Sequence, residues 1–295
     1  MPDGGRCFRP DRRIVVHKRR TMKIFSKISY MLLMLAFVLC AGSSLPAFGQ
    51  MPGKSSGKDW QFSLMPYLWM TGINGHITAR GIRSDVDVDF SDIWKHFDFG
   101  VQVHAEGMWK SRYGLFIDPT YLKLSSRKDI ALPNGGEVDK VTLKEWLVEA
   151  GGVYRLGEWP GGRGAKGNRV AVDALVGGRF VSIETAIKLN NTTPTYISRD
   201  KQWLDLFVGG RFLANLADKV PFTLRSDIGG FGLGFSSNIA WNLVSYIGYE
   251  LPWYGITPAI GYRVLYMDYH DGSGANKFVY DTWTHGPILG LAFQF

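Results

Sequence analysis

The chain has 295 residues, of which 45% are hydrophobic and 14% aromatic, and this composition excludes a disordered protein. A mean hydropathy of -0.06 is too polar for a bundle of transmembrane helices. The formal net charge of +8 and the isoelectric point near 9.4 suggest, at face value, an acidic partner such as nucleic acid.

The first 49 residues carry most of this charge. They hold nine basic and two acidic residues together with both cysteines, Cys7 and Cys40, whereas residues 50–295 hold 25 basic and 24 acidic residues. The larger part of the chain is therefore almost neutral and free of thiols. Because the excess charge is confined to this leader, we do not expect nucleic acid as a partner.

Residues 1–49 have the three parts of a secretory signal peptide. A basic start is followed by an apolar run over residues 30–42, which is too short to span a bilayer as a helix. Ala47 and Gly49 then supply the small residues that a cleavage site requires. We predict that the general secretion route exports the chain, that residues 1–49 are cleaved, and that residues 50–295 form a single domain. Met22 is an alternative start.

Apolar and polar residues alternate in segment after segment of residues 50–295. Between residues 99 and 110, Phe, Val, Val, Ala, Gly and Trp alternate with Gly, Gln, His, Glu, Met and Lys. A period of two places the two sets on opposite faces of a β-strand. The same pattern predicts strands at residues 60–70, 73–80, 84–90, 99–110, 114–124, 141–155, 170–180, 202–215, 221–233, 239–249, 256–266 and 277–295.

Residues 91–98 separate two of these segments and are expected to form a short helical loop. Ser91 is placed to cap the first turn of that helix, and the negative charge of Asp92 suits the same turn.

Alternation is compatible with two architectures. A soluble sandwich or barrel would turn the apolar faces inward, whereas a transmembrane barrel turns them to lipid and the polar faces to a lumen. Several segments have about ten residues, the length with which a tilted strand crosses a bilayer. We predict an all-β fold, a transmembrane antiparallel up-and-down β-barrel of about 12 strands. The alternative is 10 strands, with residues 73–80 and 84–90 as a loop hairpin.

An internal repeat, Asp-x-x-Val-Gly-Gly-Arg-Phe, occupies residues 173–180 and 205–212, and Glu149 precedes Arg155 by the same six positions. Because six is even, each acid shares a strand face with its arginine. On antiparallel neighbours this spacing opposes acids and arginines at similar heights. It predicts two layers, one of Glu149, Arg179 and Asp205 and the other of Arg155, Asp173 and Arg211.

Further ionisable residues fall on the same predicted face. Burying so many charges in a dry core is costly unless all are paired, whereas a wet lumen tolerates them. We interpret the set as structural packing inside the barrel, with a selectivity-setting pore lining as the alternative. The predicted lumen charge network comprises Glu106, Asp118, Glu149, Arg155, Asp173, Arg179, Asp205, Arg211, Arg225, Asp227, Glu250 and Arg263.

Gly-Gly pairs recur at residues 151–152, 177–178, 209–210 and 229–230. Glycine weakens a strand, so repeated pairs require a reason. We expect the inward glycines to make room for neighbouring arginines and to help the sheet curve into closure.

The chain ends on Phe295, and three apolar residues share its face, namely Phe293, Leu291 and Leu289. This ending resembles the last strand of bacterial outer-membrane β-barrel proteins. The resemblance implies that these four residues are a signal read by the barrel-assembly machinery. Residues 66–75 and 85–93 resemble a family of uncharacterised Gram-negative outer-membrane proteins. That resemblance implies an outer-membrane location among lipid and lipopolysaccharide, and no established activity.

Candidate chemistry is sparse. The histidines beyond the leader are His76, His96, His104, His270 and His285. His104 lies on the predicted lumen face two residues before Glu106, which favours a hydrogen-bonding role. His270 precedes Asp271 in a Gly-rich loop and is the best acid–base candidate at the rim, but adjacent residues of an extended chain point to opposite sides.

Three acids, Asp85, Asp87 and Asp89, share one face of a predicted strand. Their carboxylates suit Ca²⁺, although a polar strand face explains them equally. We expect no catalytic site, no metal and no cofactor.

These observations leave three hypotheses. The first is an outer-membrane barrel with a charge-paired lumen, acting as a small porin-like diffusion channel for small solutes or as a structural envelope protein. The second is an outer-membrane hydrolase with a rim or lipid-facing site, and the third is a soluble periplasmic ligand-binding β-barrel. A fully blocked lumen would leave only the structural version of the first hypothesis.

Overall fold

The computed structural model describes residues 59–79, 82–126, 130–131, 137–161, 169–190, 195–252 and 255–294. The expectations for the leader, including Ala47 and Gly49, and for the terminal Phe295 lie outside the described residues.

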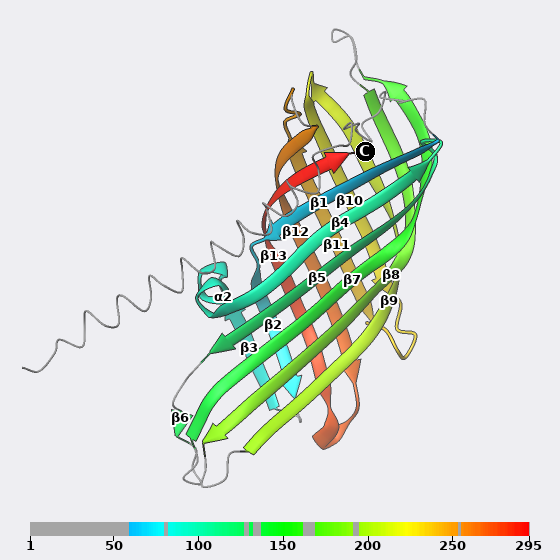
Figure 1. The fold of residues 1–295 in the computed structure, drawn as a ribbon. Coiled ribbons are helices and arrows are strands. Elements are labelled where there is room, and N and C mark those ends of the chain that lie inside the picture. The colour runs from blue at the N-terminus through cyan, green and yellow to red at the C-terminus, as the bar shows by residue number, and fades with distance from the viewer. Residues whose placement is uncertain are drawn as a thin grey trace, which may run out of the picture. The chain divides into compact units, whose positions relative to one another are not determined.

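Antiparallel strands make up most of the described chain (Figure 1). Its helical elements are the α-helix α2 (Phe90–His96) and the 3-10 turn η1 (Gly274–Asn276). In the part of the chain that the structure describes, no helix has the length and apolarity to cross a membrane. The strands are β1 (Trp60–Trp69), β2 (Gly72–Ala79), β3 (Ile82–Val88), β4 (Phe97–Trp109), β5 (Tyr113–Ser126), β6 (Ile130–Ala131), β7 (Glu137–Pro160), β8 (Arg169–Asn190), β9 (Thr195–Ala217), β10 (Val220–Gly230), β11 (Ile239–Gly248), β12 (Ile256–Asp271) and β13 (Phe278–Gln294).

A barrel closes through the strand order β1–β4–β5–β7–β8–β9–β10–β11–β12–β13, because β1 also pairs with β13. The hairpin of β2 and β3 extends the sheet beyond β13 and stands outside this ring, and the short β6 pairs with β7 alone. The prediction of an all-β antiparallel barrel is confirmed. The sheet order contains the twelve predicted strands, but the closed ring has ten of them, as in the alternative prediction of a 10-stranded barrel.

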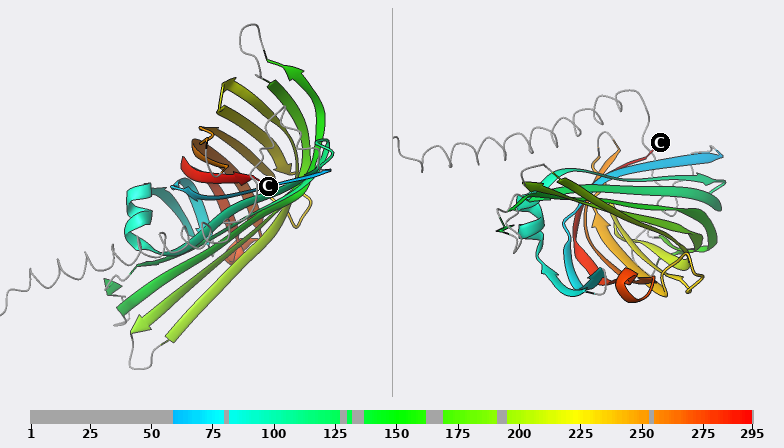
Figure 2. Two further views of the ribbon diagram at one scale, coloured as in Figure 1. Left: turned by 45° about the horizontal axis from the view of Figure 1, so that its top comes forward. Right: turned by 90° about the horizontal axis from the view of Figure 1, so that it is seen from below.

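The wall of the barrel forks at the end of β1. On one side, β13 pairs with β1 and then with β2, so these two strands continue one another. On the other side, β1 pairs with β4 only as far as Pro66 opposite Val103, and β2 pairs with β3. The two neighbours, β3 and β4, therefore diverge, and α2 connects them at the fork (Figures 1 and 2).

The helix at the fork begins one residue earlier than expected. The N–H groups of Asp92 and Ile93 both donate to the carbonyl oxygen of Asp89, so Ser91 lies inside α2 rather than capping it. Asp92 lies in the first turn as predicted, where its charge suits the helix dipole.

Apolar side chains cover the outer surface of the ring. Leu115, Val176 and Ile260 are 69%, 59% and 61% exposed, which would be unfavourable in water. Aromatic pairs bound this surface on β5 and β7: Tyr113 contacts Tyr154, with ring centroids 5.4 Å apart, and Tyr121 contacts Trp146 at 4.6 Å.

The two aromatic pairs mark the edges of a membrane-sized band. Each strand places its two aromatics eight residues apart, which is about 26 Å along the strand and, at a strand tilt of about 40°, about 20 Å along the barrel axis. The apolar band of transmembrane barrels is about 25 Å tall and is flanked by aromatic girdles. Beyond Trp146, Lys144 and Glu184 form an ion pair at 3.1 Å on the same outward face. The outer surface therefore has the pattern of a wall that faces lipid.

The lumen side also carries apolar clusters, which the alternation did not predict. One cluster consists of Met108, Phe116, Val153, Leu175 and Phe207. A larger one includes Trp69, Leu147, Val181, Trp203, Leu265, Tyr269 and Tyr280. These residues lie on the faces that were expected to be polar, so the lumen is filled partly by apolar packing.

Inward glycines allow close approach of neighbouring strands. A Cβ on Gly177 would lie 2.3 Å from the carbonyl oxygen of Ala150 and 2.6 Å from Phe207. On its outward neighbour Gly178, the nearest atom would be the end of the Leu204 side chain at 3.3 Å. The expectation that inward glycines make room for arginines was therefore wrong at Gly177, where backbone and an aromatic ring take the space.

We predict that Gly177→Ala destabilises the barrel by about 1–3 kcal/mol, because backbone atoms have to move to admit the methyl group. Gly178→Ala serves as the matched control and should change stability much less. Urea unfolding in detergent micelles, followed by tryptophan fluorescence, measures both. Equal losses for the two variants would contradict the assignment of inward and outward glycines.

Candidate functional site

Charged side chains gather inside the barrel and form its most distinctive feature. Eleven of the twelve predicted network residues are 9% exposed or less. They are Glu106, Asp118, Glu149, Arg155, Asp173, Arg179, Asp205, Arg211, Arg225, Asp227 and Arg263. The twelfth, Glu250, lies after the end of β11, where its backbone N–H donates to the carbonyl oxygen of Lys219. The strand alternation that placed Glu250 on the lumen face does not extend to that position.

Strands β7, β8 and β9 oppose their charges in the register that the spacing of six predicts. Glu149 faces Arg179, Arg179 faces Asp205, and Asp173 faces both Arg155 and Arg211. Three of these register pairs are ion pairs with donor–acceptor distances of 2.8 Å: Arg179 with Glu149, Arg155 with Asp173, and Arg211 with Asp173.

Asp205 differs from the predicted layer. Its carboxylate accepts hydrogen bonds from the backbone N–H of Ser237 at 2.6 Å and from the Ser237 hydroxyl at 3.0 Å. Arg179 instead reaches Asp227 on β10 at 2.5 Å. Within the described residues, Asp205 is not an ion-pair partner of Arg179. Strand alternation gives no signal for Ser237, because this residue lies in the loop between β10 and β11.

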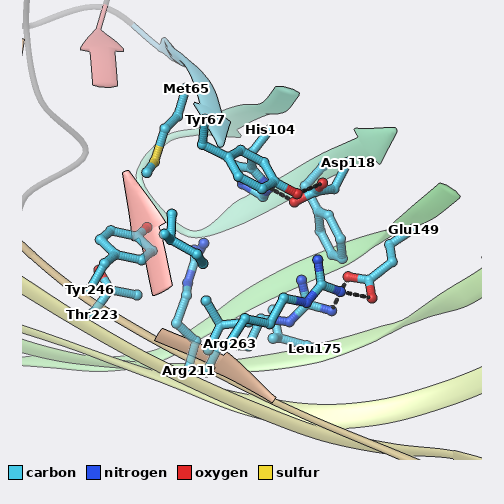
Figure 3. Close-up of a pocket in the computed structure, with 14 residues that line it drawn as sticks. Met65, Tyr67, His104, Asp118, Glu149, Leu175, Arg211, Thr223, Tyr246 and Arg263 are labelled. Atoms are coloured by element: carbon cyan, nitrogen blue, oxygen red, sulfur yellow. Dashed lines mark hydrogen bonds and ion pairs between the residues drawn. The ribbon is translucent and has the colours of Figure 1, made fainter. Parts of the chain in front are cut away.

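Other ion pairs cross the lumen. In the ring of ten strands, β7 and β12 are five places apart and therefore opposite, yet Arg263 Nη2 on β12 donates to Glu149 Oε1 on β7 at 2.6 Å (Figure 3). Arg211 on β9 also crosses the interior to Glu106 on β4, with two hydrogen bonds of 2.5 and 2.9 Å. Such bidentate pairs fix geometry as well as charge.

Glu149 is the centre of the layer of the network that also contains Arg179. It accepts from Arg179 and Arg263, and the guanidinium of Arg225 lies 3.1 Å from its second oxygen. Asp227 joins the same cluster through Arg225 at 2.8 Å and through the amide of Asn242 at 2.8 Å. A carboxylate with three guanidinium neighbours is strongly stabilised in its charged form, which offsets the cost of its burial.

Aromatic rings cover the guanidinium faces that the carboxylates leave free. Arg225 lies 4.9 Å from the ring centre of Phe116 and 5.3 Å from that of Phe207. Arg263 lies 4.7 Å from the ring of Trp69. Cation–π contacts of this kind strengthen when water is excluded. The apolar clusters and the charge network therefore pack as one unit.

His104 bridges two carboxylates. Its Nδ1 lies 3.1 Å from Asp118 and its Nε2 lies 3.5 Å from Glu106, while the hydroxyl of Tyr67 donates to Asp118 at 2.7 Å. Ionised carboxylates only accept hydrogen bonds, so both ring nitrogens donate and the imidazole is protonated. This charge makes the network neutral, because its eleven buried residues comprise six acids and five arginines.

Little free space remains beside these side chains. A cavity of about 50 Å³ adjoins Tyr67, His104, Arg211 and Tyr246 (Figure 3). This volume holds a few water molecules. Glu149, Asp173, Arg179 and Asp227 are between 0% and 2% exposed, so solvent does not reach the middle of the network.

The remaining histidine candidates lie outside this network. His270 pairs with Asp268 at 2.8 Å, whereas the adjacent Asp271 pairs with Lys201 at 2.5 Å. The hydrogen bond from Lys201 holds the pKa of Asp271 below its usual value. His270 and Asp271 therefore do not form a catalytic dyad with each other.

His285 contacts the Tyr262 hydroxyl at 2.8 Å and Asn74 at 3.0 Å. His76 lies 3.5 Å from Asp281. The side chain of His96 lies outside those described.

The three acids considered for Ca²⁺ do not converge. Asp85 lies 3.4 Å from Arg83, and Asp87 accepts a hydrogen bond from Asn74. Across the described ranges, no group of three or more His, Cys, Asp or Glu residues is placed to hold a metal ion.

The C-terminal residues of the predicted assembly signal lie on β13, which closes the ring. Phe293 stands opposite Leu64 of β1 and Ile256 of β12, and Leu289 opposite Leu68 and Ile260. Leu291 lies between them on the same strand.

No protein-family model matches the chain, and no curated protein matches it. The outer-membrane protease OmpT of Escherichia coli is a similar solved structure, with 7% identity over 86% of this chain and 100% of that chain and a TM-score of 0.41. Ail of Yersinia pestis, solved with the heparin analogue sucrose octasulfate, has 12% identity over 80% and 98% of the two chains and a TM-score of 0.33.

The translocator domain of the autotransporter NalP from Neisseria meningitidis has 12% identity over 92% and 98% of the two chains, with a TM-score of 0.34. TM-scores this low transfer neither an activity nor a ligand to this chain. The resemblance to an uncharacterised outer-membrane family stays a prediction.

We predict that Glu149→Gln destabilises the barrel by about 3–5 kcal/mol, because it leaves buried guanidinium groups without their shared charge. Glu184→Gln, at an exposed ion pair on the outer face, should cost less than about 1 kcal/mol. Chemical unfolding of the two variants in the same detergent gives the comparison. A loss at Glu149 no larger than that at Glu184 would show that the network contributes little to stability.

Proposed function

We propose that this chain is an integral outer-membrane β-barrel that serves as a structural envelope protein, with a lumen shut by its own charge network. The observation that carries the proposal is the 2.6 Å ion pair between Arg263 and Glu149, which joins opposite walls of the ring. Because this pair spans the interior and the cavity beside it measures about 50 Å³, a solute has no wide path at that level.

The pairing pattern favours a shut lumen over a porin-like diffusion channel. A channel for small solutes requires a continuous aqueous path, and charges that line such a path stay hydrated. Here Arg179 and Asp173 are 0% exposed and Glu149 is 1% exposed. A channel function would therefore require the network to separate.

The surfaces at the two ends support an outer-membrane orientation. The turns at residues 110–112 and 218–219 are short and lie at the end where β1 starts and β13 finishes, as periplasmic turns do. At the other end, β7, β8 and β9 continue beyond the aromatic pair Tyr121–Trp146. We infer lipid and lipopolysaccharide as the surroundings.

Export and assembly complete this proposal. The leader of residues 1–49 supports the general secretion route, and the apolar end of β13 supports recognition by the barrel-assembly machinery.

The two other hypotheses fit less well. A hydrolase requires a nucleophile or activated water beside an acid–base pair, whereas the His270–Asp268 pair has the amide of Asn238 as its further described partner. A soluble periplasmic barrel would have a polar outer surface, whereas Leu115, Val176 and Ile260 are exposed on this one.

Planar-bilayer recording tests the shut lumen. The purified chain should insert without stable conductance steps, because the ion pairs block the interior. The quadruple variant Glu149→Ser, Arg263→Ser, Glu106→Ser and Arg211→Ser should conduct, since it removes both cross-lumen pairs. Lys144→Ser with Glu184→Ser, a pair on the outer face, is the control and should remain silent. Stable steps from the unmodified chain would overturn the proposal and favour a porin-like channel.

A further inference from the structure

A second cavity lies at the fork of the wall, between α2, the end of β1 and inward-facing residues of β4, β5 and β7. Its apolar lining includes Leu68, Trp69, Ile73, Phe90, Ile93 and Leu122. Threonine and glutamine side chains contribute a few polar atoms, and one carboxylate, that of Glu145, completes the lining. We call this cavity the fork pocket.

Glu145 is unusual among the acids inside the barrel. Its neighbours across the strands are Leu122 and Ile183, both apolar. The adjacent cation, Lys144, points to the outer face and pairs there with Glu184. No hydrogen-bond donor or cation among the described residues pairs with the Glu145 carboxylate, in contrast to the ion-paired Glu106 and Glu149.

An unpaired carboxylate in an apolar pocket is costly in its charged form. A positive charge brought by a ligand would remove this cost, because charge-assisted pairs are strongest where water is scarce. The aromatic rings of Trp69 and Phe90 in the same lining suit a cation or an apolar group equally. Trp69 Nε1 is buried and lacks a hydrogen-bond partner among the described residues.

The fork pocket is preformed rather than a by-product of loose packing. Where β4 leaves β1, the side chain of Gln102 replaces the missing strand, and its Oε1 accepts from the backbone N–H of Trp69 at 2.5 Å. The guanidinium of Arg263 also packs against the ring of Trp69. Two walls of the pocket are therefore fixed by polar contacts that belong to the barrel itself.

We propose that the fork pocket binds a small organic cation, a primary amine with a short apolar body, whose ammonium group pairs with Glu145. The apolar body lies against Trp69, Phe90 and Ile93. A cavity of about 40 Å³ takes an ammonium group that carries one carbon atom. Glu145 lies on β7 four residues before Glu149 and nearer to the fork, so binding does not require the cross-lumen ion pairs to open. The inference thus goes beyond the structural role and does not depend on it.

Methylamine is a suitable probe, with methanol and formate as its neutral and anionic counterparts. The readout is the indole N–H resonance of Trp69 in the full mature barrel in detergent micelles, assigned with Trp69→Phe. Methylamine should shift this resonance saturably, and methanol and formate should bind at least tenfold more weakly.

Glu145→Gln should weaken methylamine binding at least tenfold, because it removes the charge while keeping the shape. Glu145→Asp should bind more tightly than Glu145→Gln, and the outer-face control Glu184→Gln should bind as the unmodified chain does. Equal binding of methanol and methylamine, no saturable shift, or unchanged binding by Glu145→Gln would overturn the inference. If Glu145→Gln does not fold, the comparison of methylamine with methanol on the unmodified chain decides.

Discussion

Ion pairs that cross the lumen hold this barrel together from the inside. Arg263 on β12 and Glu149 on β7 belong to opposite walls, and Arg211 and Glu106 make a second crossing. Each of these buried charges would be prohibitively costly alone, so each depends on its partners, which lie both on neighbouring strands and across the ring. The network therefore restricts the separation of the walls as well as the passage of solutes.

Apolar side chains on both sides of the barrel wall keep water away from this network. Exposed apolar residues such as Leu115 and Ile260 surround it, and the inward rings of Phe116 and Phe207 cover its guanidinium faces. Gly177 leaves the space that the carbonyl group of Ala150 and the ring of Phe207 occupy. Only at the fork, where β3 and β4 diverge, does an acid inside the barrel face apolar side chains without a cation, and this difference distinguishes Glu145 from the network among the described residues.

Much of this arrangement could be predicted from the sequence, because strand period and charge spacing are local properties. The six-residue offset between Asp173 and Arg179 determines which face each occupies, and the antiparallel register then opposes Arg179 to Glu149. Partners across the ring could not be predicted, since they depend on how the sheet closes. Alternation also does not reveal Ser237, a loop residue that binds Asp205, because its position is set by tertiary packing.

A double-mutant cycle on Glu149 and Arg263 tests the central claim most directly. The four chains, namely the unmodified barrel, Glu149→Gln, Arg263→Met and the double variant, would be unfolded under identical conditions. Residues in direct contact couple by about 0.5–3 kcal/mol, and for a buried ion pair we expect at least about 1 kcal/mol. Additive effects of the two substitutions, with no coupling beyond error, would contradict a lumen closed by contact between its opposite walls.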